Sequence, residues 1–489
     1  MSQVPGKGIP ANSMVTQESW PLLRSERNWS MWALLWVSLS SGTAAWGFAI
    51  GGYVAFYLNA GMGTASMIAG SLLGMFFVVL AVVPSSVKYG IESIASSIPQ
   101  LGTRGSIFSI LLQYAGIMGW NCVLLIMFGN SLGEVLVTLQ LIPSSMQGPV
   151  AAVGTLGAIA LTWWFLKNGA STVRTASMMI SIAVAAVGAL ILFFLVKNIG
   201  IATLFSAKPL APSDNMHWNY VVGSEIVMAT VLSWWPYAGS IVRMVPKGKD
   251  TIWPAMFGLG LPTAVISLIG LYSALVTGNP DPTKWMIEIG GAGFGIIALA
   301  FLALANIGTA IVGGYATGIG LRQIEALQKN TSWNQTTFLM LLPVACIGAF
   351  IPDLFVEKIP AFMAFLGVLF APVIGIQIAD CFFLRRHQLN VRSLFDKSKG
   401  SAYYYWGGVN LASVAAIVAG FVTYVSLLNP ITYEVNSLFA YAGAATPSII
   451  LSGLVYFIFT KAIVLPANKG GYQMISQVED EQEIKYKSQ

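Results

Sequence analysis

Long apolar stretches recur along the whole chain, separated by short polar segments. Each is close to the roughly 20 residues that an α-helix needs to cross the hydrocarbon core of a bilayer. The pattern predicts an all-α polytopic membrane protein. Its twelve transmembrane helices are expected near residues 31–58, 63–86, 105–137, 148–166, 176–197, 219–242, 253–277, 292–321, 335–351, 359–384, 404–428 and 436–463.

Composition agrees with a chain surrounded by lipid. Of its 489 residues, 56% are hydrophobic and 9% are charged, whereas soluble domains carry about 25% charged residues. The net charge of +6 does not indicate nucleic acid, because the basic residues are scattered over the ends of the apolar segments. Cys122, Cys346 and Cys381 lie in or beside these segments and are interpreted as reduced packing residues. His217 and His387 show no metal-ligand spacing.

Lysine and arginine sort to one side of this arrangement. With the N-terminus inside, only Lys197, Lys208, Lys284 and Lys358 face outward, which leaves 21 of the 25 basic residues inside. The positive-inside rule therefore predicts an even number of spans with both termini cytoplasmic, in the plasma (inner) membrane. Residues 1–30 are polar and show no cleavable signal peptide, so the first apolar helix is expected to act as the signal.

Two predicted spans contain weak points that are five spans apart. The first carries "SSG" at 40–42, and the sixth carries "SWWPYAGS" at 233–240, where Pro236 lacks an N–H. A broken helix inside a bilayer needs partners for its freed backbone groups. Breaks at matching positions indicate two inverted five-helix repeats with a binding site at mid-membrane. We expect the helix to unwind from Ser38 to Gly42, offering carbonyls to a cation and space to a planar ligand; close helix packing is the alternative.

The eighth span combines polar and small residues. Asn306, Thr309 and Thr317 stand among five glycines between residues 303 and 320. The Thr309 hydroxyl is a suitable oxygen ligand for a hard cation. The glycines by themselves favour a close helix contact, so both interpretations stay open for this span.

Aromatic residues lie in the middle of spans, although Trp and Tyr usually gather at membrane interfaces. Trp120 is near the centre of the third span, and Trp46, Trp234 and Trp235 fall inside others. An isolated Trp in such a position is usually a packing residue. Stacking on an indole stabilises a flat ligand by about 1–3 kcal/mol per ring, by analogy with nucleic-acid bases. Beside the helix breaks, Trp120 and Trp234 are therefore predicted to contact the substrate.

Acidic residues inside the spans are rare. Glu225 in the sixth span is a candidate for proton coupling because intramembrane acids are commonly functional; the alternative places it near the outer interface, where it is solvated. Asp380 stands close to Arg385 and Arg386 and is expected to form a structural ion pair rather than to take part in transport.

Several segments resemble the nucleobase–cation symporter-1 family, which includes purine–cytosine, uracil, allantoin and hydantoin transporters. The more specific match is "GIQIADCFFLRRHQLNVRSLF" at 375–395 followed by "AYYYWGGVN" at 402–410, with Cys381 in place of the usual Tyr. "LGTRGS" at 101–106 and "VRMVPKGK" at 242–249 are weaker matches. The resemblance implies a LeuT-like fold, an inverted five-plus-five repeat followed by two further helices.

The resemblance also implies site residues. The family's stacking Trp of the third span falls on Trp120, and its sixth-span aromatic falls on Trp234 or Val231, depending on register. Leu124 stands where hydantoin-type members have a hydrogen-bonding Gln. The substrate contacts expected on this basis are Trp120, Trp234, Gly42, Ser41, Leu124, Ser233 and Gly314.

A sodium site is implied as well. Its ligands would come from first-span carbonyls, an eighth-span carbonyl and two eighth-span hydroxyl positions. Thr309 keeps one hydroxyl and Gly308 has lost the other, so both Na⁺ and H⁺ stay open as coupling ions. The positions that the resemblance assigns to the cation are Ser38, Ser41, Ala305, Gly308 and Thr309.

Together these features predict a secondary active symporter that imports a small planar nitrogen heterocycle, such as a nucleobase or an allantoin-like compound. An amino-acid or quaternary-amine transporter on the same fold is the alternative. An enzyme is not expected, because the spans lack clustered acids or histidines. The expected partners are the substrate and the lipid bilayer, with no cofactor beyond the coupling ion, no metal beyond Na⁺, no nucleic acid and no obligate protein partner. The predicted regions are a cytoplasmic tail at 1–30, five-helix repeats at 31–200 and 201–400, two more helices at 401–465, and a cytoplasmic tail at 466–489.

Overall fold

The computed structural model describes residues 20–167 and 170–472, with side chains outside 170–181. Most of both predicted tails, 1–19 and 473–489, lies outside the described residues. The first half of the fold contains α2 (Met31–Gly42), α3 (Trp46–Val54), α4 (Ala60–Tyr89), α5 (Ser93–Leu101), α6 (Ile107–Thr138), α7 (Gln147–Leu166), α8 (Ala170–Phe194) and α9 (Ile201–Ser206). The second half contains α10 (Met216–Leu232), α11 (Trp235–Val242), α12 (Ile252–Thr277), α13 (Pro282–Leu321), α14 (Glu325–Asn330), α15 (Trp333–Phe350), α16 (Pro352–Glu357), α17 (Ile359–Ile378), α18 (Val391–Leu394), α19 (Leu411–Leu427), α20 (Phe439–Ala442) and α21 (Ala445–Phe459). Shorter helical turns are η1 (Arg24–Glu26), η2 (Ser144–Met146), η3 (Leu195–Ile199), η4 (Gly248–Asp250), η5 (Ala379–Leu384) and η6 (Thr460–Val464).

Each predicted span contains a helix or a pair of helices, but the count of twelve is not confirmed. Among the described residues, nine helices are long and apolar enough to cross a membrane, and the bent pair α2–α3 makes a tenth. The sixth and eleventh predicted spans fall short because α10 and α19 have 17 residues each. The eleventh also begins later than predicted, at Leu411, since Gly407 and Gly408 adopt positive φ values of 64° and 95° just before it.

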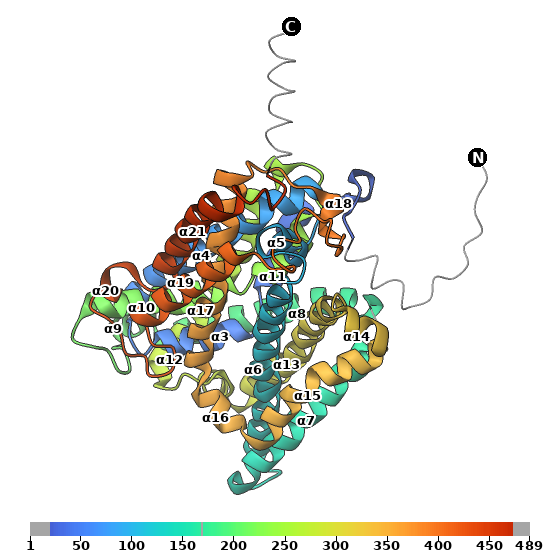
Figure 1. The fold of residues 1–489 in the computed structure, drawn as a ribbon. Coiled ribbons are helices and arrows are strands. Elements are labelled where there is room, and N and C mark those ends of the chain that lie inside the picture. Colours follow the sequence, from blue (N-terminus) through green and yellow to red (C-terminus); the bar gives the residue numbers. More distant parts are fainter. Residues whose placement is uncertain (1–19, 168–169, 473–489) are drawn as a thin grey trace.

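Helix contacts follow the pattern of two inverted five-helix repeats. The first-span helices α2 and α3 pack on α12 of the seventh span, and correspondingly α10 and α11 of the sixth pack on α4 of the second. The third and eighth spans, α6 and α13, pack on each other, and each also packs on the next long helix, α7 or α15. Figure 1 shows α6, α7, α13 and α15 gathered on one side of the molecule. The predicted LeuT-like five-plus-five architecture is confirmed.

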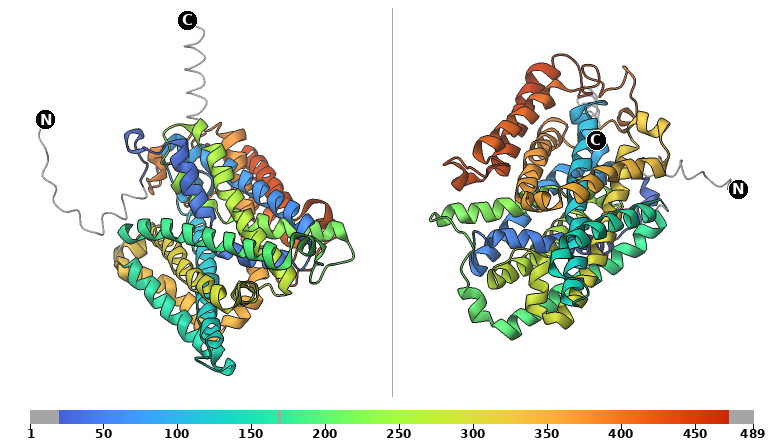
Figure 2. Two further views of the ribbon diagram at one scale, coloured as in Figure 1. Left: turned by 180° about the vertical axis from the view of Figure 1, so that it is seen from behind. Right: turned by 90° about the horizontal axis from the view of Figure 1, so that it is seen from below.

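The two additional helices lie outside this core. α19 and α21 pack on each other and on α17, and Figure 2 shows them at the edge of the molecule. Gly375 of α17 allows the close contact, because a Cβ there would lie 2.1 Å from the carbonyl oxygen of Ile449.

The first-span break is confirmed, but it lies a few residues beyond the predicted segment. The chain bends by 63° between α2 and α3, and Ser38 to Gly42 are still helical while 43–45 are not. The Thr43 N–H donates to the carbonyls of Leu39 and Ser40, which closes the end of α2. The expectation that residues 38–42 themselves unwind is therefore wrong.

Small residues of the first span serve close packing instead. A Cβ on Gly258 of α12 would lie 2.5 Å from the Ser38 Cβ, and a Cβ on Gly42 would lie 2.8 Å from the Leu259 carbonyl oxygen. Gly51 of α3 comes closer still: a Cβ there would lie 1.8 Å from the Ser267 carbonyl oxygen and 2.4 Å from the Leu271 nitrogen. Both halves of the broken span are thus seated on α12, as the packing alternative proposes.

This contact yields a direct prediction. Gly51→Ala should lower the apparent melting temperature of the detergent-solubilised protein, because the new methyl group meets backbone atoms that have no alternative rotamer. Overpacking of this kind costs about 1–3 kcal/mol or more. Gly148→Ala is the matched control, since a Cβ on this helical glycine meets nothing within 4 Å. Equal melting temperatures for the two variants would contradict the α3–α12 contact.

The sixth-span break lies at Ser233 and Trp234, between α10 and α11. It precedes Pro236, which occupies the first turn of α11. That placement suits proline because the N–H groups of the first turn have no intrahelical partner.

The helix α5, which is too short to span a bilayer, lies buried at one end of the bundle. All nine of its residues are buried. Glu92 caps it by accepting hydrogen bonds from the N–H groups of Ile94 and Ala95 at 2.6 and 2.7 Å. Burial raises the pKa of the Glu92 carboxyl, and these two N–H donors oppose that rise.

Both described chain ends lie at this α5 end of the fold. Arg243, which follows α11, donates to the Trp20 carbonyl, and Tyr472 donates to Asp380, whose other oxygen accepts from Gln100 of α5. The described part of the chain therefore enters and leaves the fold at the same end. The ion pair expected at Asp380 is confirmed with Arg385, at 2.7 Å.

Candidate functional site

An aromatic cluster forms where the two helix breaks meet the third span. The Trp46 ring lies 5.0 Å from that of Trp120 and 6.1 Å from that of Trp234, centroid to centroid. Trp46 is the first residue of α3, directly after the first break, and Trp234 lies within the second. The structure thus brings together aromatic residues that are far apart in the sequence.

Two predicted substrate contacts are joined by a hydrogen bond. Trp120 Nε1 donates to Ser233 Oγ at 3.2 Å, and Ser233 Oγ donates to the Thr230 carbonyl at 2.6 Å. The sixth-span register is also informative: Trp234 joins the cluster, whereas Val231 is a fully buried residue within α10. The sixth-span residue that joins the aromatic cluster is therefore Trp234.

Phe362 of α17 belongs to the cluster, although sequence reasoning missed it. Its ring meets Trp120 edge-on at 5.3 Å. Gly119 makes room for it, because a Cβ there would lie 2.2 Å from the Phe362 ring. Only its position in the tenth span could have suggested this contact, and an apolar Phe in an apolar helix carries no such signal. Leu124 is buried one turn beyond Trp120.

Polar atoms converge at Gly313 on the eighth span. A Cβ at this position would lie 3.2 Å from the Tyr237 hydroxyl oxygen and 3.4 Å from Asn121 Oδ1. Asn121 also donates to the Ala310 carbonyl at 3.3 Å, and Tyr237 packs edge-on against Trp234 at 5.4 Å. Asn121 and Tyr237 are the polar groups that the sequence analysis did not select.

The predicted Gly314 points elsewhere. A Cβ on Gly314 would lie 2.9 Å from Leu166 Cδ1 and 3.5 Å from Met340 Cε, so this position faces α7 and α15. Successive helix positions diverge by about 100°, which explains why its neighbour Gly313, rather than Gly314, faces the Tyr237 hydroxyl. Gly42 likewise packs against α12 rather than toward the aromatic cluster.

The predicted cation ligands retain only part of their donor set. The helical hydrogen-bonding pattern engages the Ser38 carbonyl, whereas the Ser41 carbonyl lies in the last turn of α2, where helical N–H partners run out. Thr309 Oγ donates to the Ala305 carbonyl at 3.0 Å, so hydroxyl and carbonyl oxygens stand together. Gly308 is buried and adds no side-chain oxygen.

Asn306, next to Ala305, is fully buried, and neither its amide oxygen nor its amide nitrogen has a hydrogen-bond partner. It lies seven residues before Gly313, close to two helical turns, and therefore shares that face of α13. An unpartnered buried amide costs free energy unless a ligand, ion or water satisfies it.

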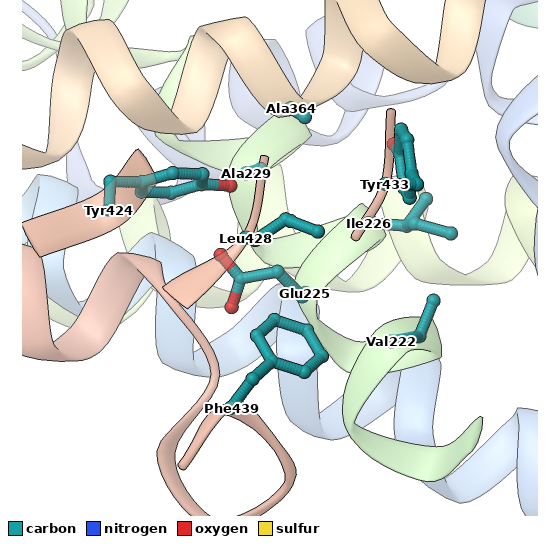
Figure 3. Close-up of a pocket in the computed structure, with 9 residues that line it drawn as sticks. All are labelled: Val222, Glu225, Ile226, Ala229, Ala364, Tyr424, Leu428, Tyr433 and Phe439. Carbon is teal, nitrogen blue, oxygen red and sulfur yellow. The ribbon is translucent and has the colours of Figure 1, made fainter. Parts of the chain in front are cut away.

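Glu225 occupies a separate region on α10, beside a small cavity shown in Figure 3. Its carboxylate accepts hydrogen bonds from the N–H groups of Ala444 at 3.1 Å and Ala445 at 2.8 Å. It therefore caps the N-terminus of α21, where a negative charge is stabilised. Gly443, with φ of 65°, allows this approach: a Cβ there would lie 2.5 Å from a Glu225 carboxylate oxygen. Glu225 is buried rather than solvated.

Comparison with known proteins places this geometry in context. A family model described as permease for cytosine/purines, uracil, thiamine, allantoin matches residues 21–455. A purine-uracil permease from Arabidopsis thaliana is 25% identical over 41% of this chain and 35% of its own length. An allantoin permease from Bacillus subtilis (strain 168) is 26% identical over 21% of this chain and 19% of its own length. The chain therefore aligns with about a third or less of either relative.

Solved structures of Mhp1 share the fold. The inward-facing conformation superposes with a TM-score of 0.76 at 14% identity, over 97% of this chain and 99% of that one. A closed conformation with bromovinylhydantoin bound, described as a nucleobase-cation-symport-1 family transporter, gives a TM-score of 0.71 at 15% identity, over 92% and 96%. At this identity the likeness establishes the architecture alone.

Proposed function

This chain belongs to the family of permeases for cytosine/purines, uracil, thiamine and allantoin, and from that premise we propose that it is a secondary active symporter for a small planar nitrogen heterocycle. Membership makes it a multi-pass membrane transporter and not an enzyme. The supporting observation is the aromatic cluster at the junction of the two helix breaks, where Trp120, Trp234 and Trp46 meet. The relatives' names, a purine-uracil permease and an allantoin permease, support a heterocyclic substrate.

The chemistry of the cluster suits such a ligand. Indole faces stack on flat rings, and Asn121 and Tyr237 supply hydrogen-bonding groups beside Gly313. The proposed substrate contacts remain Trp120, Trp234 and Ser233, together with Leu124, one turn beyond Trp120, and Ser41, at the end of α2 before the first break. Asn121 replaces Gly314 and Gly42 in this proposal.

Alternating access would couple the ligand to a cation. The cation favours the outward-open state, the substrate closes it, and the two repeats rock about the site. Cation and substrate then tighten each other's binding by the same factor. The proposed cation ligands are the Ser41 and Ala305 carbonyls and the Thr309 hydroxyl; Glu225 is the alternative coupling group if H⁺ is the ion.

We propose that the protein lies in the plasma membrane and that both of its termini are cytoplasmic. Charge sorting and the shared location of both described chain ends support it. The α5 end would then face inward, with Arg243 and Arg385 close to it.

Uptake into proteoliposomes tests the function. Labelled cytosine, uracil, adenine, hypoxanthine, allantoin and a hydantoin would be supplied with an imposed Na⁺ gradient and, separately, with a pH gradient. We expect one or more of them to accumulate under one gradient. No accumulation of any heterocycle under either gradient would contradict the proposed substrate class. Competition by amino acids or quaternary amines would instead favour the alternative transporter, since aromatic clusters also bind quaternary ammonium groups.

Thr309→Ala tests the coupling ion. If Na⁺ binds here, the Na⁺ concentration for half-maximal uptake should rise about tenfold, the factor that corresponds to roughly 1.4 kcal/mol. Thr423→Ala is a matched control: the Thr423 hydroxyl makes the same bond to the carbonyl four residues back, but on α19. If Thr309→Ala leaves the Na⁺ dependence intact, the assignment is wrong. Loss of pH-driven uptake in Glu225→Gln would instead assign proton coupling to Glu225.

A further inference from the structure

We infer that the indole of Trp46 covers the stacking surface of Trp120 and has to leave it before a planar ligand can bind there. This inference rests on the proposed function for the identity of the ligand, and on the geometry of the cluster for everything else. Nothing in the family description or in the relatives' names assigns a role to Trp46. Its side chain would act as an internal competitor that lowers the apparent affinity of the site for planar ligands.

The ring spacing carries the inference. A flat ligand held between two aromatic faces needs them about 7 Å apart, twice the usual carbon–carbon contact distance of about 3.5 Å. Trp46 and Trp120 have centroids 5.0 Å apart with planes inclined by 39°, so no ring fits between them. Trp46 also contacts Trp234 at 6.1 Å. One indole therefore contacts both predicted stacking partners.

The other neighbours of Trp120 cannot be displaced as readily. Phe362 of α17 meets Trp120 edge-on and packs against Gly119, which lies on α6 beside Trp120. The Trp120 ring itself is held by its hydrogen bond to Ser233. Among the described residues, two rings contact Trp120: Phe362 meets it edge-on, and Trp46 is inclined to it by 39°. Trp46 is therefore the ring that lies over the face of Trp120.

The backbone around Trp46 is anchored, so the movement has to come from its side chain. A Cβ on Gly47 would lie 2.8 Å from Ile266, and Gly51 is in backbone contact with Ser267 on the same helix, α12. Ahead of the break, Gly42 is seated on α12 as well. Because both halves of the broken span rest on one helix, rotation of the Trp46 side chain next to 43–45 is the route by which the ring leaves.

Displacement of the indole lowers the affinity of the site for any ring. A ligand that stacks on Trp120 replaces contacts that Trp46 gives up. The apparent affinity of every ligand is reduced by the fraction of protein in which the indole is in place. Removing the indole should therefore tighten binding of the transported heterocycle.

The probe is free fluoroindole, which resembles the side chain that Trp46→Ala removes. Trp46→Ala should bind free fluoroindole, detected by fluorine NMR as a saturable signal distinct from the micelle-partitioned compound, and wild type should not. Adding Trp120→Ala to this variant should abolish the signal. A heterocycle that wild type transports should compete with fluoroindole and should bind Trp46→Ala about tenfold more tightly than wild type, the gain expected from removing two ring contacts.

The outcomes separate the inference from the proposed function. Simultaneous binding of fluoroindole and the heterocycle, or weaker heterocycle binding in Trp46→Ala, would overturn the inference while leaving a heterocycle transporter in place. Trp120-dependent fluoroindole binding without binding of any heterocycle in the panel would contradict the proposed function and still support a ring site covered by Trp46. If Trp46→Ala is not monodisperse, Trp46→Phe serves instead: its smaller ring should still tighten heterocycle binding, and an unchanged or weaker affinity would contradict the inference.

Discussion

Replacing Arg385 with leucine is expected to destabilise this protein more than any other single change considered. The guanidinium is 1% exposed, and its Nε donates to Asp380 at 2.7 Å. Its remaining donors reach the carbonyls of Gly470 at 2.8 Å and Pro99 at 3.1 Å. The Tyr472 ring packs against it at 4.0 Å.

Removing this side chain leaves a buried carboxylate without its counter-charge. The loss of one partner from a buried ion pair costs about 3–5 kcal/mol. Asp380 would keep hydrogen bonds from Gln100, Tyr456 and Tyr472, which lessen the cost without neutralising the charge. The measurement is the apparent melting temperature of the detergent-solubilised protein, together with the yield of monodisperse material.

Arg386→Leu is the matched control, because its side chain is the next in the sequence and is exposed. An exposed charge contributes about 1 kcal/mol or less, so this variant should melt close to wild type. Equal melting temperatures for Arg385→Leu and Arg386→Leu would contradict the structural role of the buried pair. The family-like residues at 375–395 and 402–410 would then need a role other than forming this buried ion pair.

Trp120→Ala is expected to abolish measurable substrate binding or reduce it by one to two orders of magnitude. The substitution removes the ring on which the ligand is proposed to stack, worth about 1–3 kcal/mol, and also the Nε1 donor to Ser233. The measurement is the affinity for the transported heterocycle in purified protein, with uptake in proteoliposomes as the second readout. Trp120→Phe keeps a ring and should retain part of the affinity.

Trp36→Ala controls for the loss of an indole from an exposed position of the fold. Trp36 lies on α2 with 67% of its side chain exposed, so its removal should leave the affinity unchanged. An affinity loss of equal size in Trp36→Ala and Trp120→Ala would show that general destabilisation, rather than the stacking site, is responsible.

The segment that best supports the family resemblance proves to be structural. Asp380, Arg385 and Tyr405 come from "ADCFFLRR" and "AYYYWGGVN", and they join α5 to the end of the tenth span. Tyr405 donates to the Pro99 carbonyl, which Arg385 also contacts. A buried charge needs a complete set of partners, which accounts for so distinctive a run of residues at a place remote from the aromatic cluster.

Much of the architecture could be predicted from the sequence because lipid imposes strict rules. Backbone groups in hydrocarbon must pair within a helix, so apolar length alone predicts the helices, and basic residues predict the orientation. The two breaks were found through Ser40–Gly42 and Pro236, residues that weaken a helix. The first break lies at 43–45, just beyond the predicted residues, whereas the second lies at Ser233–Trp234, within the predicted segment and ahead of Pro236. Helix ends depend on neighbouring helices, which the local sequence does not specify.

Side-chain direction required the tertiary structure. Ser38 and Gly42 read as a site from the sequence, yet they face α12. Gly313 rather than Gly314 faces the Tyr237 hydroxyl, a difference of one residue that periodicity cannot decide when both are glycines. Glu225 similarly gains its partners, Ala444 and Ala445, from a helix about 220 residues away.

The sequence by itself thus determined the class of protein, its inverted repeats and the aromatic residues Trp120 and Trp234, because hydropathy, charge and helix-breaking residues act locally. Only the tertiary structure decided which groups share a surface, since contacts between α6, α13 and the two breaks depend on packing across the whole chain. Trp46 illustrates the difference. In the sequence it is one Trp in an apolar helix, and in the fold its ring lies against both proposed stacking partners.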